Sequence, residues 1–275
     1  MSQSHVAQPV QASGFRGWVA RYPLLAFFAF AYAWSWLAWL PGLLGVGGMV
    51  PLLIGGLGPL LAAVAVTRLS GESVRAWWRP VWRWRVGGRF YAYALGLPPL
   101  LYGLINLVLA VLGYRIDPSL FLGRLPAYLG TLAFVAVLGG GLEEPGWRGF
   151  ALPHLQRRHT PMVATLILGL AWGIWHIPLY GPLGFVVPLV LAFFYTWLYN
   201  RTGSVLLCIL LHASFTPAQN HLILLPDTVV LADGPANTIG LVTLGTYVAA
   251  VIALLILTRG RLGQAAGQRR AVGAT

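Results

Sequence analysis

The sequence predicts an all-α fold, a polytopic membrane bundle of about eight transmembrane helices with both termini cytoplasmic. Hydrophobic residues make up 58% of the 275 residues and charged residues only 9%, about a third of the charge of a soluble chain. The apolar residues stand in runs near the roughly 20 residues that a helix needs to cross a bilayer. They lack the alternation of membrane-barrel strands. A soluble fold is therefore excluded.

Eight charge-free apolar runs are the expected spans. The first, residues 23–43, is too long for a secretory signal core, so we expect it to be an uncleaved helix. The runs are residues 23–43, 49–67, 90–113, 126–142, 161–180, 182–199, 203–225 and 238–258. The predicted organisation is a disordered cytoplasmic N-terminus over 1–22, one transmembrane domain over 23–258 and a basic cytoplasmic tail over 259–275.

The arginines predict the topology independently. All 18 basic residues are Arg, and six acids leave a net charge of +12. With eight spans and a cytoplasmic N-terminus, 16 arginines fall in cytoplasmic segments and only Arg115 and Arg124 fall outside. The positive-inside rule describes this asymmetry. A lysine-free chain rich in Ala and Gly is typical of a GC-rich bacterial genome, so we expect a multi-pass protein of a bacterial inner membrane.

Tryptophans and arginines alternate between the second and third runs, over residues 75–85. A nucleic-acid site is one interpretation of such a mixture, but nucleic-acid binding needs an exposed basic face, and here the arginines lie between apolar runs. Rings and guanidinium groups together also suit the lipid headgroup layer. We predict membrane lipid as a partner and no nucleic acid.

Charged residues inside apolar sequence identify a candidate site. Glu143 and Glu144 directly follow the fourth run, and Arg148 comes four residues later. If the helix continues through Pro145 with a kink, over about residues 126–155, both carboxylates lie below the membrane surface. An ionisable group at midbilayer costs about 2.5 to 3.5 kcal/mol, so a carboxylate pair there indicates a functional site. The alternative is an interfacial ion pair at a helix end.

The spacing gives the two carboxylates different roles. Glu144 and Arg148 stand at i and i+4, so they share a helix face and can form an ion pair. Glu143 points about 100° away around the helix. It is left free to act as a general base.

Two histidines lie in other apolar runs. His176 is in the fifth run with Trp172 at i−4, and His212 is in the seventh with Thr216 at i+4. A lone membrane His often makes only an interhelical hydrogen bond. Two of them with an acidic pair are what a water-activating site needs, and two His with one carboxylate are also a catalytic zinc set.

These residues resemble the three motifs of the CPBP family of intramembrane proteases, which includes the CAAX prenyl endopeptidase Rce1 and bacterial Abi proteins linked to bacteriocin maturation or self-immunity. Trp172 stands where the family has Phe, and Thr216 stands where Asn is usual. The resemblance covers roughly residues 126–220. The matched positions are Glu143, Glu144 and Arg148 for EExxxR, Trp172 and His176 for FxxxH, and His212 and Thr216 for HxxxN.

The resemblance implies an intramembrane endopeptidase acting on CAAX-type or bacteriocin-like membrane-associated substrates, with its active site open to the cytoplasmic side. Glu143 would activate a water, and His176 and His212 would orient it and stabilise the oxyanion, directly or through zinc. Glu144 and Arg148 would support the first motif. If zinc is used, Glu144, His176 and His212 would be its ligands, and a metal-free water is the alternative.

A second class of function stays open, namely a non-catalytic membrane scaffold, an immunity protein or a transporter of the same fold. An ion pathway should carry polar residues along whole helices. Here the polar residues cluster at one level, which favours a closed site. The sequence makes no prediction of the oligomeric state.

Overall fold

A computed structural model describes residues 14–233 and 238–264 of the chain. Over these residues the fold is helical and contains no strand, as predicted. Six helical segments in them are long and apolar enough to cross a membrane, so the protein is a multi-pass membrane protein. These segments are α2 (Pro23–Leu43), α3 with α4 (Val50–Gly56 and Gly58–Leu69), α6 (Gly88–Val111), the segment Ser119–Gln156, η4 with α12 (Pro182–Phe185 and Val186–Thr202) and α15 (Thr238–Thr258).

Two further helices, α10 (Pro161–Trp175) and α13 (Val205–His221), coincide with the fifth and seventh predicted runs. They have 15 and 17 residues, and both are extensively buried. Helix α13 packs against α6 and α7 (Ser119–Val137), and α10 packs against α12. All eight predicted runs are therefore helical, while the count of eight membrane crossings stays a prediction.

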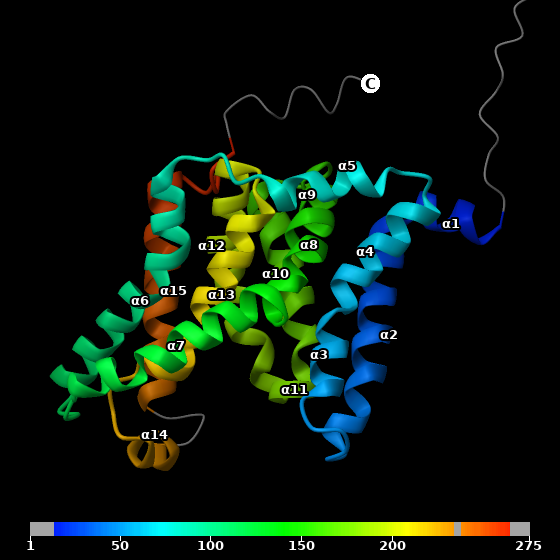
Figure 1. Ribbon diagram of the computed structural model, residues 1–275. Helices are drawn as coiled ribbons and strands as arrows, with labels where there is room; N and C mark the ends of the chain where they lie inside the picture. The colour runs from blue at the N-terminus through cyan, green and yellow to red at the C-terminus, as the bar shows by residue number, and fades with distance from the viewer. Residues whose placement is uncertain (1–13, 234–237, 265–275) are drawn as a thin grey trace, which may run out of the picture.

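The long helices run in alternating directions through the bundle (Figure 1). Helix α2 leaves the end that holds α1 (Phe15–Arg21), and α15 returns to that same end. We call it the α1 end. The short helix α14 (Asp227–Asp233) lies at the opposite end. Helix α5 (Val74–Trp78) and the following turn η1 (Arg79–Trp82) lie at the α1 end, where the arginine-rich connection is found.

The helices that carry the two histidines begin at capping residues. The hydroxyl of Thr160 accepts a hydrogen bond from the N–H of Val163 at the start of α10, and Ser204 does the same for Leu207 at the start of α13. Such side-chain caps satisfy N–H groups that have no partner within the helix. Gly203, with φ of +61°, ends α12 in the left-handed conformation. The tight turn between α12 and α13 follows from this Gly-Ser pair.

The N-terminal segment corrects one prediction. Residues 1–13 lie outside the described part of the chain, but residues 15–21 form helix α1 rather than a disordered stretch over 1–22. Val19 is fully buried and the Phe15 ring stacks on Trp18, while α1 packs against α4. A single short helix of this kind is too short to show as an apolar run. Of the predicted tail 259–275, residues 265–275 lie outside the described residues.

The segment that carries the first motif is also different from the prediction. The sequence allowed a helix that continues with a kink through Pro145, over about residues 126–155, but α7 ends at Val137 and Gly139 separates it from the next turn. Pro145 is accommodated because it stands in the first turn of α8, where a missing N–H breaks no helical bond. The segment consists of the 3₁₀ turn η2 (Gly140–Glu143), α8 (Glu144–Gly146), the π-helical turn η3 (Trp147–Ala151) and α9 (Leu152–Gln156). The short helix α11 (Ile177–Tyr180) follows α10. π-helical turns are rare and often lie at functional sites.

An aromatic cluster holds this broken segment against α2. The ring of Phe27 lies 5.5 Å from Trp147 edge-on and 5.1 Å from Phe150 in a stacked arrangement. Trp147 also meets Trp175 of α10 edge-on at 5.8 Å. Trp147 is fully buried and Trp175 nearly so. These contacts place the first motif between α2 and α10.

Candidate active site

Glu144 and Arg148 form the ion pair that their spacing predicts. One guanidinium nitrogen of Arg148, Nη1, lies 2.9 Å from each carboxylate oxygen of Glu144. Both side chains have no exposed surface. A buried charge is tolerated when it is paired, and removing one partner leaves the other uncompensated. The other residues of the site pack around this buried ion pair.

Two aromatic rings enclose the guanidinium group of Arg148. Its central carbon lies 4.2 Å from the centroid of the Trp172 ring and 4.1 Å from that of Tyr195 in α12. Cation–π attraction of this kind is strongest where water is excluded. The remaining nitrogens, Nε and Nη2, have no hydrogen-bond partner among the described residues. The rings thus hold the cation in place, and Tyr195 is a site residue that sequence reasoning missed.

His212 is oriented by Glu144. Its Nδ1 lies 2.9 Å from Oε1 of that carboxylate. A carboxylate paired with an arginine accepts hydrogen bonds, so Nδ1 carries the hydrogen and donates it. The other ring nitrogen, Nε2, is then free for chemistry. A carboxylate that fixes the tautomer of a histidine is a recurring arrangement in catalytic sites.

Only one of the two carboxylate oxygens of Glu143 is held by hydrogen bonds from other side chains. Its Oε2 accepts hydrogen bonds from the indole nitrogen of Trp172 at 2.9 Å and from that of Trp147 at 3.4 Å. Only 5% of Glu143 is exposed. The sequence predicted a free Glu143, whereas the structure holds one of its two oxygens. The indole of Trp172 makes a bond to Glu143 that a phenyl ring at this position has no means to make.

Gly140 lies close to the free ring nitrogen of His212 and to the free carboxylate oxygen of Glu143. A Cβ atom added to this residue would overlap Nε2 of His212 and would stand 3.2 Å from Oε1 of Glu143. Nε2 of His212 and Oε1 of Glu143 therefore both lie close to the same side of Gly140. Sequence reasoning did not single out Gly140, although the Gly-Gly-Gly run before the two glutamates was a visible signal.

His176 completes the group of residues that the motifs predict. Its Nδ1 lies 2.9 Å from the carbonyl oxygen of Trp172, and since a carbonyl only accepts, Nδ1 donates. The ring meets Trp175 edge-on at 4.8 Å and stacks on Tyr180 at 5.5 Å. These contacts leave Nε2 of His176 available, as in His212.

Two pockets meet at His176 and Tyr180. One, of about 430 Å³, includes Gly140 and Glu143 in its lining together with apolar residues of α2 and α3. The other, of about 370 Å³, includes His212 and Thr216. Tyr180 lines both and is 69% exposed. It was missed in the sequence, although it follows His176 at i+4 and so shares its face.

Thr216 lies at the edge of the site. Its hydroxyl donates to the carbonyl oxygen of His212, one turn earlier, at 3.3 Å. This bond is to the backbone of its own helix. Thr216 lines the smaller pocket together with Gln219 and Asn220. Thr216 therefore forms part of the wall of the smaller pocket, beside the ring of His212.

The described side chains do not fit the zinc site that the resemblance implies. No group of three or more His, Cys, Asp or Glu in the described part of the chain is arranged to hold a metal ion. Both oxygens of Glu144, a predicted ligand, face Arg148, and one of them also faces Nδ1 of His212. No step of the reaction that we derive for this site therefore passes through a metal.

Comparison with known proteins finds similarity over the stretch that carries this site. Residues 124–216 match the family described as type II CAAX prenyl endopeptidase Rce1-like, and this stretch contains all three motifs. The chain is also 31% identical over 120 residues to CAAX prenyl protease 2 of Methanococcus maripaludis, a match that covers 37% of this chain and 44% of the relative. The alignment thus spans less than half of that relative's length. Residues 124–216 of the chain are thus similar to the Rce1-like family of CAAX prenyl endopeptidases.

Proposed function

We propose that the chain is an intramembrane endopeptidase that hydrolyses peptide bonds of membrane-associated substrates with a water activated by Glu143. One observation carries the proposal. Oε1 of Glu143 and Nε2 of His212 lie close to the same side of Gly140, while Trp172 and Glu144 hold the opposite sides of these two groups. The similarity of residues 124–216 to the Rce1-like family supports the class of reaction.

The first step is proton transfer to Glu143. A water in the space beside Gly140 donates one hydrogen bond to Oε1 of Glu143 and places a lone pair toward the scissile carbonyl carbon. As the water attacks, its proton passes to Oε1. Glu143 then gives this proton to the nitrogen of the leaving amine, so that the carboxylate is restored. A positioned general base contributes about 10²- to 10⁴-fold in rate.

The two histidines have complementary parts in this scheme. In a neutral ring whose Nδ1 carries the hydrogen, Nε2 accepts a hydrogen bond, so His176 is suited to hold the second hydrogen of the water. Nδ1 of His212 faces Glu144, so its Nε2 is the nitrogen left to face the reacting group. When both ring nitrogens carry a hydrogen, the Nε2–H donates to the oxyanion of the tetrahedral intermediate. Donors that face a developing negative charge usually lower the barrier of such a reaction more than any other group does.

The two pockets support a peptide substrate that passes across the site. Glu143 lines the larger pocket and His212 the smaller, with His176 and Tyr180 between them. A chain bound in both pockets would present one peptide bond to Glu143. The larger pocket is walled by apolar side chains such as Leu52 and Leu179, which suits a lipid-modified or otherwise apolar segment. A CAAX-type or bacteriocin-like peptide is the proposed substrate, and the name of the M. maripaludis relative supports the first.

We also propose that the α1 end faces the cytoplasm of a bacterial cell. The arginine-rich connection after α4 lies at that end, as do both ends of the described chain (Figure 1). Helix α8, which begins with Glu144, lies nearer the α1 end than the end with α14. A reporter fused after the last residue tests this orientation, because a reporter active only in the cytoplasm should be active there.

The substrate test compares membranes from cells that express the parental protein or Glu143→Gln. Mass spectrometry of their membrane peptides should find new C-termini only with the parental protein. A purified prenylated peptide that ends in a CAAX sequence, offered in lipid nanodiscs, should be cut by the parental protein. If neither assay separates the two proteins, the chain is a non-catalytic scaffold or immunity protein, and the protease proposal fails.

A further inference from the structure

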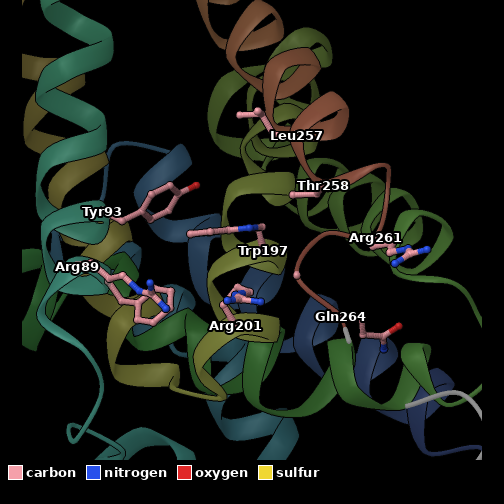
Figure 2. Close-up of a pocket in the computed structure, with 10 residues that line it drawn as sticks. Arg89, Tyr93, Trp197, Arg201, Leu257, Thr258, Arg261 and Gln264 are labelled. Atoms are coloured by element: carbon pink, nitrogen blue, oxygen red, sulfur yellow. The ribbon is translucent and has the colours of Figure 1, made fainter. Parts of the chain in front are cut away.

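A third pocket lies away from the active site, at the α1 end of the bundle. It has a volume of about 480 Å³ and is formed where α6 begins, where α12 ends and where the chain turns after α15 (Figure 2). None of its lining residues lines either pocket of the active site. The proposed hydrolysis makes no use of it.

Three arginines from three separate helical segments surround this pocket. Arg89 is the second residue of α6, Arg201 is the last but one of α12, and Arg261 comes three residues after the end of α15. In Figure 2, Trp197 lies between Arg89 and the turn that carries Arg261, and the Arg261 side chain points away from the other two in this view. The ion pairs found among the described residues involve other side chains. Three guanidinium groups that have no carboxylate partner among the residues the structure describes make this pocket a place for an anion.

The opposite wall of the pocket is aromatic and apolar. The rings of Tyr93 and Trp197 lie 4.5 Å apart, and Phe90 meets Trp197 at 6.1 Å. The pocket thus combines positive charge with an aromatic surface.

The apolar side of the pocket continues along the membrane-spanning helix α15. Leu257 lines the pocket and is 83% exposed. Ile252 and Ile256, which precede it in α15, are 51% and 71% exposed. Ile252 and Ile256 stand at i and i+4 and so share a face. An apolar strip that leads from a cationic pocket into the bilayer matches the form of a phospholipid, with its phosphate at the arginines and an acyl chain along the helix. Basic pockets between membrane helices recognise anionic headgroups in this way.

We propose that this pocket binds the phosphate group of an anionic phospholipid, with an acyl chain lying along Ile252, Ile256 and Leu257 of α15. The positions of Arg89, Arg201 and Arg261 at helix ends place the phosphate in the headgroup layer at the α1 end. Binding ties together α6, α12 and α15, and α12 carries Tyr195 of the active site. The proposal does not depend on the proposed protease activity.

The test measures lipid binding by native mass spectrometry of the purified full-length protein in detergent, with phosphatidylglycerol or phosphatidylcholine added. The pocket variant Arg89→Gln with Arg201→Gln and Arg261→Gln removes three exposed charges. The matched control removes three exposed charges at the same end but outside the pocket, by Arg16→Gln, Arg21→Gln and Arg157→Gln. The parental protein and the control should retain phosphatidylglycerol in preference to phosphatidylcholine. The pocket variant should bind it roughly a hundredfold more weakly, because each basic residue near an anionic lipid contributes about a factor of five.

Two results would overturn the proposal. If the pocket variant and the control retain phosphatidylglycerol equally, the lipid binds elsewhere. If inorganic phosphate at millimolar concentration binds the parental protein and displaces the lipid, the pocket is a site for free phosphate instead. Unchanged size-exclusion profiles and thermal unfolding of both variants show that the comparison is between folded proteins.

Discussion

Nδ1 of His212 lies 2.9 Å from Oε1 of Glu144, although 68 residues separate the two in the chain. This contact joins the first motif to the third. Because Glu144 also pairs with Arg148, one carboxylate both balances a buried cation and orients a histidine. The two adjacent glutamates therefore have different surroundings, since Glu144 faces Arg148 and His212, whereas Oε2 of Glu143 faces the indoles of Trp147 and Trp172.

Replacing Arg148 with Met should destabilise the fold. The change leaves Glu144 buried with a charge that only His212 faces, and breaking a buried pair costs about 3 to 5 kcal/mol. Thermal unfolding of the purified protein measures the effect. Arg158→Met is the matched control, because Arg158 is exposed and has no described ion pair. Equal stability of the two variants would show that the buried pair does not support the fold.

Trp172→Phe should slow cleavage while the protein stays folded. A phenyl ring keeps the aromatic face next to Arg148 but removes the N–H that bonds Oε2 of Glu143. A hydrogen bond to a charged group is worth about 1.5 to 3 kcal/mol, so we expect a loss of roughly 10- to 100-fold in kcat. The exposed Trp82→Phe should cleave at the parental rate. Parental activity in Trp172→Phe would mean that this bond does not position the base.

Gly140→Ala should abolish activity. The added methyl group would overlap Nε2 of His212 and crowd Oε1 of Glu143, so the ring has to move or the water is excluded. Gly130→Ala in α7 makes a fair comparison, since a Cβ there meets no atom within 4 Å. Cleavage rates of both variants in nanodiscs provide the measurement. Full activity of Gly140→Ala would place the reacting water somewhere else.

Treatment with a chelator should leave cleavage unchanged. The described side chains do not form a three-ligand metal site, and Glu144 is held by Arg148 and His212. The experiment pairs elemental analysis of the purified protein with activity before and after chelation. Loss of activity that zinc restores would contradict the metal-free scheme and would require Glu144 or Glu143 to turn toward the two histidines.

The spacing of residues along the sequence predicts much of this site. Residues four apart share a helix face, so EExxxR predicts the pairing of Glu144 with Arg148, and the pair forms even though Arg148 lies in a π-helical turn. The apolar runs likewise predict where the helices lie, because the length of a span is set by the bilayer. Local rules of this kind need no knowledge of how helices pack.

The remainder of the site depends on packing between distant segments. The bond from Trp172 to Glu143 joins α10 to η2, and the ring of Tyr195 reaches Arg148 from α12. No spacing within one helix predicts such contacts. The break at Gly139 and the close approach of Gly140 to His212 were also hidden, because glycine in an apolar run is equally consistent with an unbroken membrane helix.

The most direct test of the proposed chemistry is the rate at which the purified Glu143→Gln protein cuts a membrane-bound peptide. Gln keeps the size of the side chain and an oxygen that can accept from Trp172, but it is not a base. We expect no measurable cleavage by Glu143→Gln, unchanged thermal unfolding, and the parental rate for the exposed Glu72→Gln. Cleavage by Glu143→Gln at the parental rate would contradict the claim that this carboxylate activates the water.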